Sequence, residues 1–505
     1  MKLIDNFLNR ITMYRLVLYY LIFLHCVAML LALTGILKYD VFSMLASCAF
    51  LVAVCWATNK LFARVFHVPA NVESVYISAA ILALIIAPLR SLNDLWFFGW
   101  AGVLAMASKY IVALKHKHIF NPVAFAVALT YFVLNRPATW WVGNGAMMPF
   151  VLLGGLLLTR KLGRFDLVFS FLSGVVGIAL ISDIFMLGNL PGDLLRTMIY
   201  SSTLFFVFVI LTEPLTTPPT RKLRILYGVL TGLLIAPQFH IGSFYVTPEL
   251  AILMSNLFSY IVSPKTRAVL KLKEKIRVGA DIYDFVFTSS HPFAYIPGQY
   301  MEWTLGHKRT DNRGNRRYFT LASAPSENEL RMGIKFYQRP STFKQALLAM
   351  NPGDKIIAAQ VAGDFTLPVD SAQKCIFIAG GVGITPFRSM IQYLIDVRQT
   401  QPITLFYANR TVDDVVYKDV FDRAERELGI RTIYAVERVP NEQVSWVGKV
   451  GFIDAQLIMN AVPDYHQCIF YISGPQVMID VFKQTLRQIG IPASQIKTDF
   501  FPGLA

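Results

Sequence analysis

A glycine-rich run stands where an apolar strand gives way to a helical pattern, and it reads Gly380-Gly381-Val382-Gly383-Ile384-Thr385-Pro386. A turn without side chains lets the backbone come close to a pyrophosphate. The first amides of the following helix add unpaired N–H groups and a partial positive charge. The run is not the dinucleotide pattern G-x-G-x-x-G, and a tight strand-to-helix connection would use the same residues. Taken alone, it favours a nucleotide site over a plain turn by a small margin.

Three other segments carry groups that suit a flavin and a nicotinamide. Residues 317–323, Arg-Tyr-Phe-Thr-Leu-Ala-Ser, place a guanidinium, an aromatic ring and a hydroxyl on one strand. A flavin dinucleotide needs a fork for its pyrophosphate, a stacking face and a hydrogen bond near its N5 atom. Ser473-Gly474-Pro475 ends a later apolar strand, and residues 499–503 are Asp-Phe-Phe-Pro-Gly. A surface ion pair or a core-covering ring would explain each segment singly, but the four together favour a redox site.

These segments lie in a region of ordinary charge that begins after Pro264. Short stretches of period two, at 283–287, 300–304 and 331–336, predict an antiparallel β-barrel through about Pro368. From Cys375 onward strand, glycine turn and helix recur, which predicts a doubly wound α/β nucleotide domain. Ligands of such sheets bind beyond the carboxyl ends of the strands. We therefore predict a barrel domain over 264–370 and a nucleotide-binding domain over 371–505.

The four segments together resemble the ferredoxin–NADP reductase family over Lys271 to Leu504, and residues 297–300 (Pro-Gly-Gln-Tyr) and 407–410 (Tyr-Ala-Asn-Arg) fit it as well. The resemblance implies a barrel that binds FAD and a domain that binds NADH or NADPH. It assigns to FAD the residues Arg317, Tyr318, Phe319, Thr320, Ser341, Thr342 and Phe343. It assigns to the nicotinamide dinucleotide Gly380, Gly381, Gly383, Thr385, Pro386, Arg410, Gly474 and Pro475.

The resemblance also implies individual roles. Arg317 would contact the pyrophosphate, and Arg410 would lie near the adenosine end of the dinucleotide. Thr320, Ser473 and Phe501 would serve the reaction itself, with the Phe501 ring covering the flavin. The chain departs from the family at two places, because many relatives have Cys in place of Ser473 and Glu in place of Asp499.

The residues before Ser263 have a different composition, which dominates the whole chain of 505 residues: 55% are hydrophobic and only 16% are charged. We predict a polytopic α-helical membrane domain over 1–263 with about ten spans. The expected spans are 16–36, 41–57, 72–89, 96–108, 119–134, 140–158, 167–187, 198–211, 225–239 and 244–262. Lys and Arg gather in alternate loops, which predicts a multi-pass protein of the plasma (inner) membrane with both termini cytoplasmic.

The net charge of +15 fits basic loops beside a bilayer better than nucleic-acid binding, so we expect no nucleic-acid partner. The five cysteines form no C-x-x-C pair and no ferredoxin-type spacing. We therefore expect no disulfide, no iron–sulfur cluster and no metal site.

Two stretches of the membrane half, residues 120–125 (Phe-Asn-Pro-Val-Ala-Phe) and 212–219 (Thr-Glu-Pro-Leu-Thr-Thr-Pro-Pro), are similar to the membrane flavin subunits of the Rnf and sodium-pumping NADH:quinone oxidoreductase complexes. That family attaches FMN to a threonine in an S-G-A-T motif. The chain has no S-G-A-T, so the resemblance implies neither covalent FMN nor ion pumping. It leaves open a non-covalent flavin in the membrane domain.

The sequence as a whole predicts a membrane-bound oxidoreductase that passes electrons from NAD(P)H through FAD to an acceptor. That acceptor is a quinone, a group in the membrane half or a redox partner subunit. Asp413 and Asp414 follow Arg410 and would repel a 2′-phosphate, which favours NADH. One alternative is a haem-bearing ferric reductase or NADPH oxidase, but such bundles need two histidine pairs and the spans offer only His25 and His240. The other is a membrane transporter that senses NADH without turnover.

Overall fold

The computed structural model describes residues 8, 11–66, 72–114, 117–186, 202–235, 240–241, 244–263, 267–289, 294–307, 311, 314–338, 340–439 and 446–499. Contacts within the chain divide it into two units, centred on Met1–Lys265 and Thr266–Phe501. Each unit has its own architecture.

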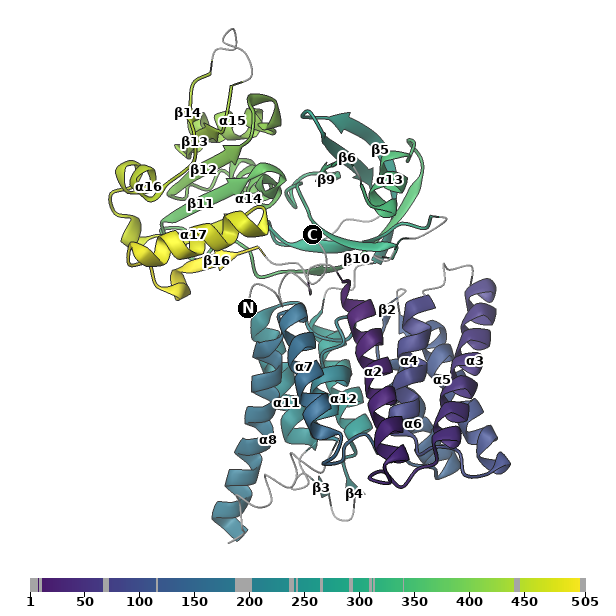
Figure 1. The fold of residues 1–505 in the computed structure, drawn as a ribbon. Coiled ribbons are helices and arrows are strands. Elements are labelled where there is room, and N and C mark those ends of the chain that lie inside the picture. The colour runs from purple at the N-terminus through teal and green to yellow at the C-terminus, as the bar shows by residue number, and fades with distance from the viewer. Residues whose placement is uncertain are drawn as a thin grey trace. The chain divides into compact units, whose positions relative to one another are not determined.

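The first unit is a bundle of helices that run alongside one another (Figure 1). Its longer helices are α2 (Met13–Leu33), α3 (Val41–Val65), α4 (Val72–Ile85), α5 (Leu95–Ile111), α6 (Pro122–Leu134), α7 (Met148–Leu162), α8 (Phe165–Met186), α11 (Arg221–Ile235) and α12 (Pro248–Val262). Local sequence fixes several starts. The Asp40 carboxylate accepts from the Ser43 amide to begin α3, and Asn121 caps α6 directly before Pro122.

Two described helices, α2 and α3, are long and apolar enough to cross a membrane by length and composition. Shorter apolar helices occupy Glu73–Ile85, Pro122–Leu134, Phe165–Ile181 and Pro248–Val262. The predicted count of about ten spans is therefore not confirmed. The reason is length, because a 13-residue helix such as α6 rises only about 20 Å against a hydrocarbon core of about 30 Å.

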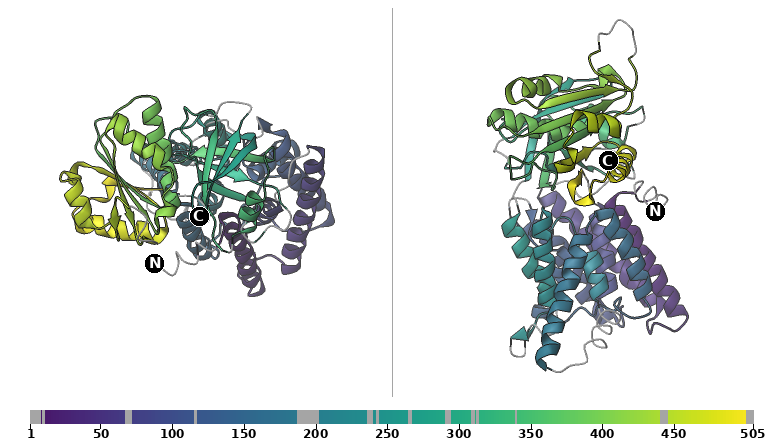
Figure 2. Two further views of the ribbon diagram at one scale, coloured as in Figure 1. Left: turned by 90° about the horizontal axis from the view of Figure 1, so that it is seen from above. Right: turned by 90° about the vertical axis from the view of Figure 1, so that its left-hand side faces the viewer.

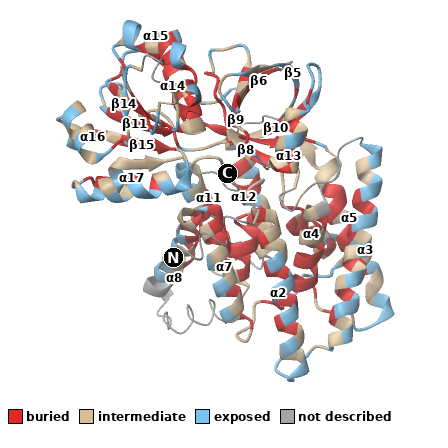
Figure 3. Ribbon diagram, turned by 45° about the horizontal axis from the view of Figure 1, so that its top comes forward, coloured by how far each residue is buried: buried red, intermediate tan, exposed pale blue. Residues whose placement is uncertain are grey.

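The helices of this unit combine buried and exposed residues (Figure 3), and large apolar side chains are among the exposed ones. Leu33 is 72% exposed, Phe42 81% and Val133 68%. Exposed apolar surface of this kind marks contact with a membrane or another protein.

The second unit begins with the predicted antiparallel barrel. Its strands are β5 (Arg267–Arg277), β6 (Ile282–Thr288), β7 (Tyr300–Thr304), β8 (Arg316–Thr320), β9 (Leu330–Lys335) and β10 (Lys355–Ala362), with α13 (Thr342–Leu348) between β9 and β10. They pair in the order β8-β7-β10-β5-β6-β9. Because side chains alternate along each strand, those of Leu270, Phe285 and Trp303 lie together in one apolar core. A backbone bond from the Ala322 amide to the Arg331 carbonyl, 2.8 Å long, joins the chain after β8 to β9.

The parallel sheet follows, and its strands are β11 (Cys375–Gly380), β12 (Ile403–Asn409), β13 (Arg431–Val436), β14 (Lys449–Val450), β15 (Ile469–Ser473) and β16 (Ile496–Thr498). Their order is β14-β13-β12-β11-β15-β16, and every pair is parallel. α14 (Thr385–Asp396) and α15 (Lys418–Leu428) cover one face, and α16 (Ala455–Ala461) and α17 (Gln476–Gln488) cover the other (Figure 2).

The strand order reverses at β11, because β12 lies on one side of it and β15 on the other. In open α/β sheets the crevice beyond the carboxyl ends of the strands at such a reversal is the place where ligands bind. The glycine turn after β11 lies at this point. The doubly wound sheet predicted from the sequence is confirmed.

All five cysteines of the chain are free thiols. In the second unit, burial raises the pKa of the Cys375 thiol to about 12 and that of the Cys468 thiol to about 11. Since the thiolate is the reactive form, we expect neither to be alkylated at pH 8 in the folded protein and both to be alkylated after denaturation. Mass spectrometry of iodoacetamide-treated protein measures this, and labelling of either thiol before unfolding would contradict the burial described.

Candidate functional site

The glycine turn after β11 packs against the turn after β15 with no side chain between the two backbones. A Cβ atom on Gly383 would lie 2.5 Å from the Ser473 carbonyl oxygen and 2.6 Å from the Gly474 nitrogen. A Cβ on Gly380 would lie 2.2 Å from the Met478 sulfur. Glycine is therefore required at position 383, where the neighbouring atoms are backbone, whereas at position 380 a larger residue would displace the flexible Met478 side chain. Gly381 has φ +53° with nothing within 4 Å of its Cβ position, so the surface above the turn is open.

Contacts of the other predicted turn residues stabilise the conformation of the glycine turn. The Thr385 hydroxyl donates to the Val382 carbonyl at 3.2 Å, which closes the turn, and Pro386 occupies the first turn of α14. Gly474 and Pro475 line the same junction, because a Cβ on Gly380 would also lie 3.2 Å from Pro475 Cδ. The structure thus brings the predicted dinucleotide residues 380–386 and 473–475 together at one edge of the sheet.

Arg410 does not join this group as closely. It follows β12 and is exposed. Asp414, one of the two acids used to favour NADH, is buried and forms an ion pair with Lys335 of β9 at 2.8 Å. Its charge is already neutralised within the chain, so only the exposed Asp413 retains the expected repulsion of a 2′-phosphate.

A carboxylate joins the barrel to the nucleotide sheet. Asp499 Oδ2 accepts hydrogen bonds from the Thr320 hydroxyl at 3.4 Å and from the Ser473 hydroxyl at 3.3 Å. Both hydroxyls are buried. The Asp499 amide donates to the Ile472 carbonyl at 3.1 Å, which holds the residue beside β15. Thr320 and Ser473 are both predicted to serve the reaction, whereas Asp499, which belongs to the 499–503 segment and departs from the family, has no predicted role of its own.

The guanidinium of Arg317 lies at the start of α13. It is 7% exposed and donates to the carbonyls of Gly314, at 3.2 Å, and of Arg316, at 2.6 Å. It also stacks over the Phe343 ring at 5.2 Å from the ring centre. The predicted flavin residues of β8 and of the 341–343 segment are thus neighbours in space.

Asp311 shows that this place accepts an anion. Its carboxylate is 3.7 Å from Arg317 Nη2 and accepts from the Thr342 amide at 3.1 Å. The Thr342 hydroxyl accepts from the Asp311 amide at 3.0 Å. A guanidinium and a backbone amide therefore already share one anionic partner. These are the donors that the resemblance assigns to the pyrophosphate of FAD.

Alternation along β8 separates the remaining predicted flavin residues onto two faces. Phe319 shares a face with Arg317, and its ring centre lies 6.1 Å from that of Phe343. Tyr318 is on the opposite face, where its hydroxyl donates to Glu302 at 2.8 Å. Ser341 caps α13 by accepting from the Lys344 amide. Phe501, predicted to cover the flavin, lies outside the described residues, as does its neighbour Phe500.

In the first unit, the two stretches that carry the membrane-family resemblance meet. The Asn121 side-chain amide donates to Glu213 at 2.7 Å, and the Asn121 backbone amide donates to Asn256 at 2.8 Å. Asn256 in turn donates to the Tyr227 hydroxyl at 2.9 Å. Glu213 follows a π-helical turn, Phe206–Ile210. Among the described residues, no group of three or more His, Cys, Asp or Glu side chains is placed to hold a metal ion.

Comparison with known proteins supports the same two-part interpretation. Residues 377–484 match the family model of the oxidoreductase NAD-binding domain, and residues 144–269 match that of the NQR2, RnfD, RnfE family. The resemblances inferred from sequence are confirmed for both regions. The chain therefore joins an NAD-binding oxidoreductase module to a domain of a membrane family.

Among curated proteins, the flavohemoprotein of Bacillus cereus is 26% identical over 216 residues, which cover 41% of this chain and 53% of that protein. The F subunit of the Na(+)-translocating NADH-quinone reductase of Klebsiella pneumoniae is 29% identical over 168 residues, covering 32% of this chain and 41% of that protein. The chain thus spans about half, or less, of the length of these relatives.

Among solved structures, the Amycolatopsis cytochrome P450 reductase GcoB is similar with a TM-score of 0.42 and 19% identity over 47% of this chain and 70% of that one. The cytochrome b5 reductase domain of Ulva prolifera nitrate reductase gives a TM-score of 0.41 and 21% identity over 47% and 98% of the two chains.

Proposed function

We propose that the chain is a membrane-bound flavoprotein oxidoreductase that passes electrons from NADH or NADPH through FAD to an acceptor in the membrane or in a partner subunit. The carboxylate of Asp499, shared by Thr320 of the barrel and Ser473 of the nucleotide sheet, is the observation that carries this proposal. It joins the strand predicted to hold the flavin to the edge predicted to hold the nicotinamide. The proposed domains are 1–263 for the membrane, 264–370 for FAD and 371–505 for the dinucleotide.

The side chains divide the work of binding. Arg317 and the amides of residues 341–343 would hold the pyrophosphate of FAD, while Phe319 and Thr320 would lie beside its ring system. Residues 380–386 would hold the dinucleotide through backbone groups, and the open space at the Cβ position of Gly381 supports this. A bound flavin accepts an electron pair from a nicotinamide and releases electrons singly, which suits a membrane acceptor. Phe501 stays in the proposal as the residue that covers the flavin.

The membrane half is proposed to be multi-pass in the plasma (inner) membrane with both termini cytoplasmic. The alternating Lys and Arg content of its loops supports this orientation. The acceptor is proposed to be a quinone, a non-covalently bound flavin in the membrane domain or a redox partner subunit. We propose NADH as the donor on the exposed carboxylate of Asp413 alone, because Asp414 is already paired with Lys335.

An absorption spectrum of the detergent-purified protein, followed by acid release and chromatography of the flavin, tests the proposal directly. We expect one releasable FAD per chain, and steady-state oxidation of NADH with a dye acceptor. A Soret band near full occupancy would instead identify a haem-bearing reductase. Bound NADH without turnover would identify a sensor.

Asp499→Ala is expected to slow anaerobic flavin reduction by NADH about tenfold while FAD remains bound. The change leaves two buried hydroxyls without their charged acceptor, and a hydrogen bond to a charged group contributes ~1.5 kcal/mol, or about tenfold in rate. Asp464→Ala is the control, because the carboxylate of Asp464 forms an ion pair with Lys374 on the surface, away from the predicted site. Parent-like reduction by Asp499→Ala in stopped-flow absorbance would remove Asp499 from the site.

A further inference from the structure

A buried arginine on α14 reaches from the nucleotide sheet to the barrel. Arg388 follows Thr385 of the glycine turn by one helical turn, and its side chain is 7% exposed. Its Nη1 donates to the Ala322 carbonyl at 2.9 Å and to Glu327 Oε2, and its Nη2 donates to Glu327 Oε1 at 2.9 Å. The guanidinium thus forms a two-pronged contact with the segment that directly continues the flavin strand β8.

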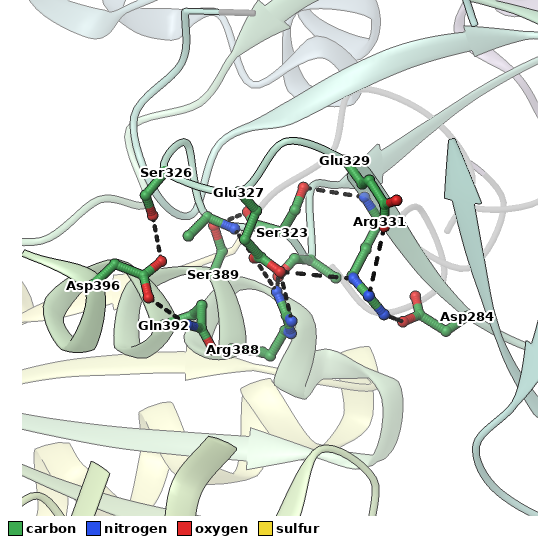
Figure 4. Close-up of polar contacts among 12 residues, drawn as sticks. Asp284, Ser323, Ser326, Glu327, Glu329, Arg331, Arg388, Ser389, Gln392 and Asp396 are labelled. Carbon is green, nitrogen blue, oxygen red and sulfur yellow. Dashed lines mark hydrogen bonds and ion pairs between the residues drawn. The ribbon is translucent and has the colours of Figure 1, made fainter. Parts of the chain in front are cut away.

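The acceptors of this contact are held on the barrel side (Figure 4). Glu327 Oε2 also accepts from the Ala324 amide at 2.6 Å, which closes the loop after β8. Arg331 of β9 lies 3.7 Å from Glu327 Oε1 and binds Asp284 of β6 at 3.1 Å. The Glu327 carboxylate that binds Arg388 is therefore linked, through Arg331, to the two barrel strands β9 and β6. A shift of α14 would therefore strain the contact between Arg388 and Glu327.

Neighbouring contacts fix the same junction. The Ser389 hydroxyl donates to the Ser323 carbonyl at 2.6 Å, again between α14 and the end of the flavin segment. A Cβ atom on Gly333 of β9 would lie 2.9 Å from the Thr385 methyl and 2.5 Å from the Tyr417 hydroxyl. The barrel and the start of α14 are thus packed so closely that a side chain at position 333 would not fit unless its neighbours moved.

We propose that Arg388 is a positioning residue for electron transfer: by binding Glu327 and the Ala322 carbonyl, it sets the spacing between the glycine turn that holds the dinucleotide and the strand that holds the flavin. This inference rests on the proposed function. Arg388 touches neither ligand in this proposal, and it acts through residues 320–323 on one side and 383–385 on the other.

The chemistry of this contact is better suited to fixing the distance between the glycine turn and the flavin strand than to stabilising the fold. A buried ion pair loses hydration on both partners, so its net stabilisation is small, whereas its geometry is well defined. The planar fork of arginine fixes two directions at once, which a lysine ammonium does not. Glu327 keeps the Ala324 amide and Arg331 as partners if Arg388 is removed. Removal of the arginine side chain is therefore expected to let the distance between the glycine turn and the flavin strand vary, without unfolding the loop after β8.

The experiment compares Arg388→Met, Arg388→Lys and Glu327→Gln in the purified full chain, with Ser326→Ala as the matched control. Ser326 also joins the two domains, through Asp396, but its contact is on the surface. Anaerobic stopped-flow reduction at a series of NADH concentrations gives the limiting rate and the half-saturating concentration separately. FAD content, thermal midpoint and the long-wavelength charge-transfer absorbance between nicotinamide and flavin are measured on the same samples.

Arg388→Met is expected to lower the limiting rate at least about tenfold, because small displacements of reacting groups have effects of this size. FAD content and half-saturating NADH are expected to stay within about twofold of the parent, and the charge-transfer absorbance is expected to fall. Arg388→Lys should recover part of the rate, Glu327→Gln should lose part of it, and Ser326→Ala should match the parent.

Two results would overturn the inference. One is a parent-like limiting rate in folded, FAD-replete Arg388→Met or Glu327→Gln. The other is loss of FAD or thermal stability in proportion to the rate, which would show a purely structural role. If Arg388→Met does not fold, Glu327→Gln decides alone. A parent protein whose FAD is not reduced by NADH would refute the proposed function instead, and the variants would then show no difference in rate to compare.

Discussion

Gly383→Ala is expected to slow flavin reduction by NADH at least about 100-fold while leaving FAD bound to the barrel. The added methyl group would lie 2.5 Å from the Ser473 carbonyl oxygen and 2.6 Å from the Gly474 nitrogen, and both atoms are backbone. A flexible side chain could move aside, but here one of two strand-end turns must shift. Displacing the site by about 1 Å is enough to cost about 100-fold in rate. We therefore expect at least that loss in stopped-flow flavin reduction.

Gly306→Ala provides the control for this change, because Gly306 lies in the barrel with nothing within 4 Å of its Cβ position. It should bind FAD and react with NADH like the parent. Rapid reduction of the Gly383→Ala protein would show that the two turns are not packed as described. Loss of FAD from that protein would show that the effect spreads into the barrel.

Arg317→Ala is expected to weaken FAD binding by about 10- to 150-fold. The change removes a buried, charge-assisted fork from the place where Asp311 and the Thr342 amide already meet, and such contacts contribute ~1.5–3 kcal/mol. The purified variant should lose FAD on dilution and regain it when FAD is added. Fluorescence of the released flavin measures both steps.

Arg316→Ala is the matched comparison, since Arg316 is the preceding residue but pairs with Glu302 at 3.3 Å. It changes the same charge on the same strand without touching the start of α13. Full FAD occupancy in diluted Arg317→Ala would refute the assignment of Arg317. Equal loss from both variants would attribute the effect to net charge.

The parts of the second unit that depend on local pattern were predictable from the sequence. Period-two stretches predicted the barrel strands, and the glycine turns after β11 and β15 predicted the sheet and the edge where these turns meet. Thr320 and Ser473 were placed in one site by resemblance, and the structure brings them to the same carboxylate. Predictions of this kind hold because the conformation of each strand depends on its own residues and on packing against a shared core.

Contacts between distant segments were not predictable in the same way. Asp414 pairs with Lys335, which lies 79 positions away in the sequence. This ion pair neutralises a carboxylate that was expected to favour NADH. Arg388 and Glu327, 61 positions apart, show no local signal at all, because a charged residue on a helix usually faces water. The membrane half differs for another reason. Hydropathy reports apolar length, whereas caps and prolines set the helix boundaries, as at Asn121 and Pro122, where α6 begins.

The hydroxyls of Thr320 and Ser473 meet on Asp499, which comes after every strand of both domains in chain order. Domains fold in order as a chain leaves the ribosome, so the helical unit and the barrel are made before this carboxylate. A chain in which only the helical unit and the barrel have been made therefore lacks the group that joins the proposed flavin strand to the proposed nicotinamide edge. Reactivity toward NADH would then arise only after Asp499 has been added, which would spare the cell reductases that hold a flavin without this group and lose electrons to oxygen.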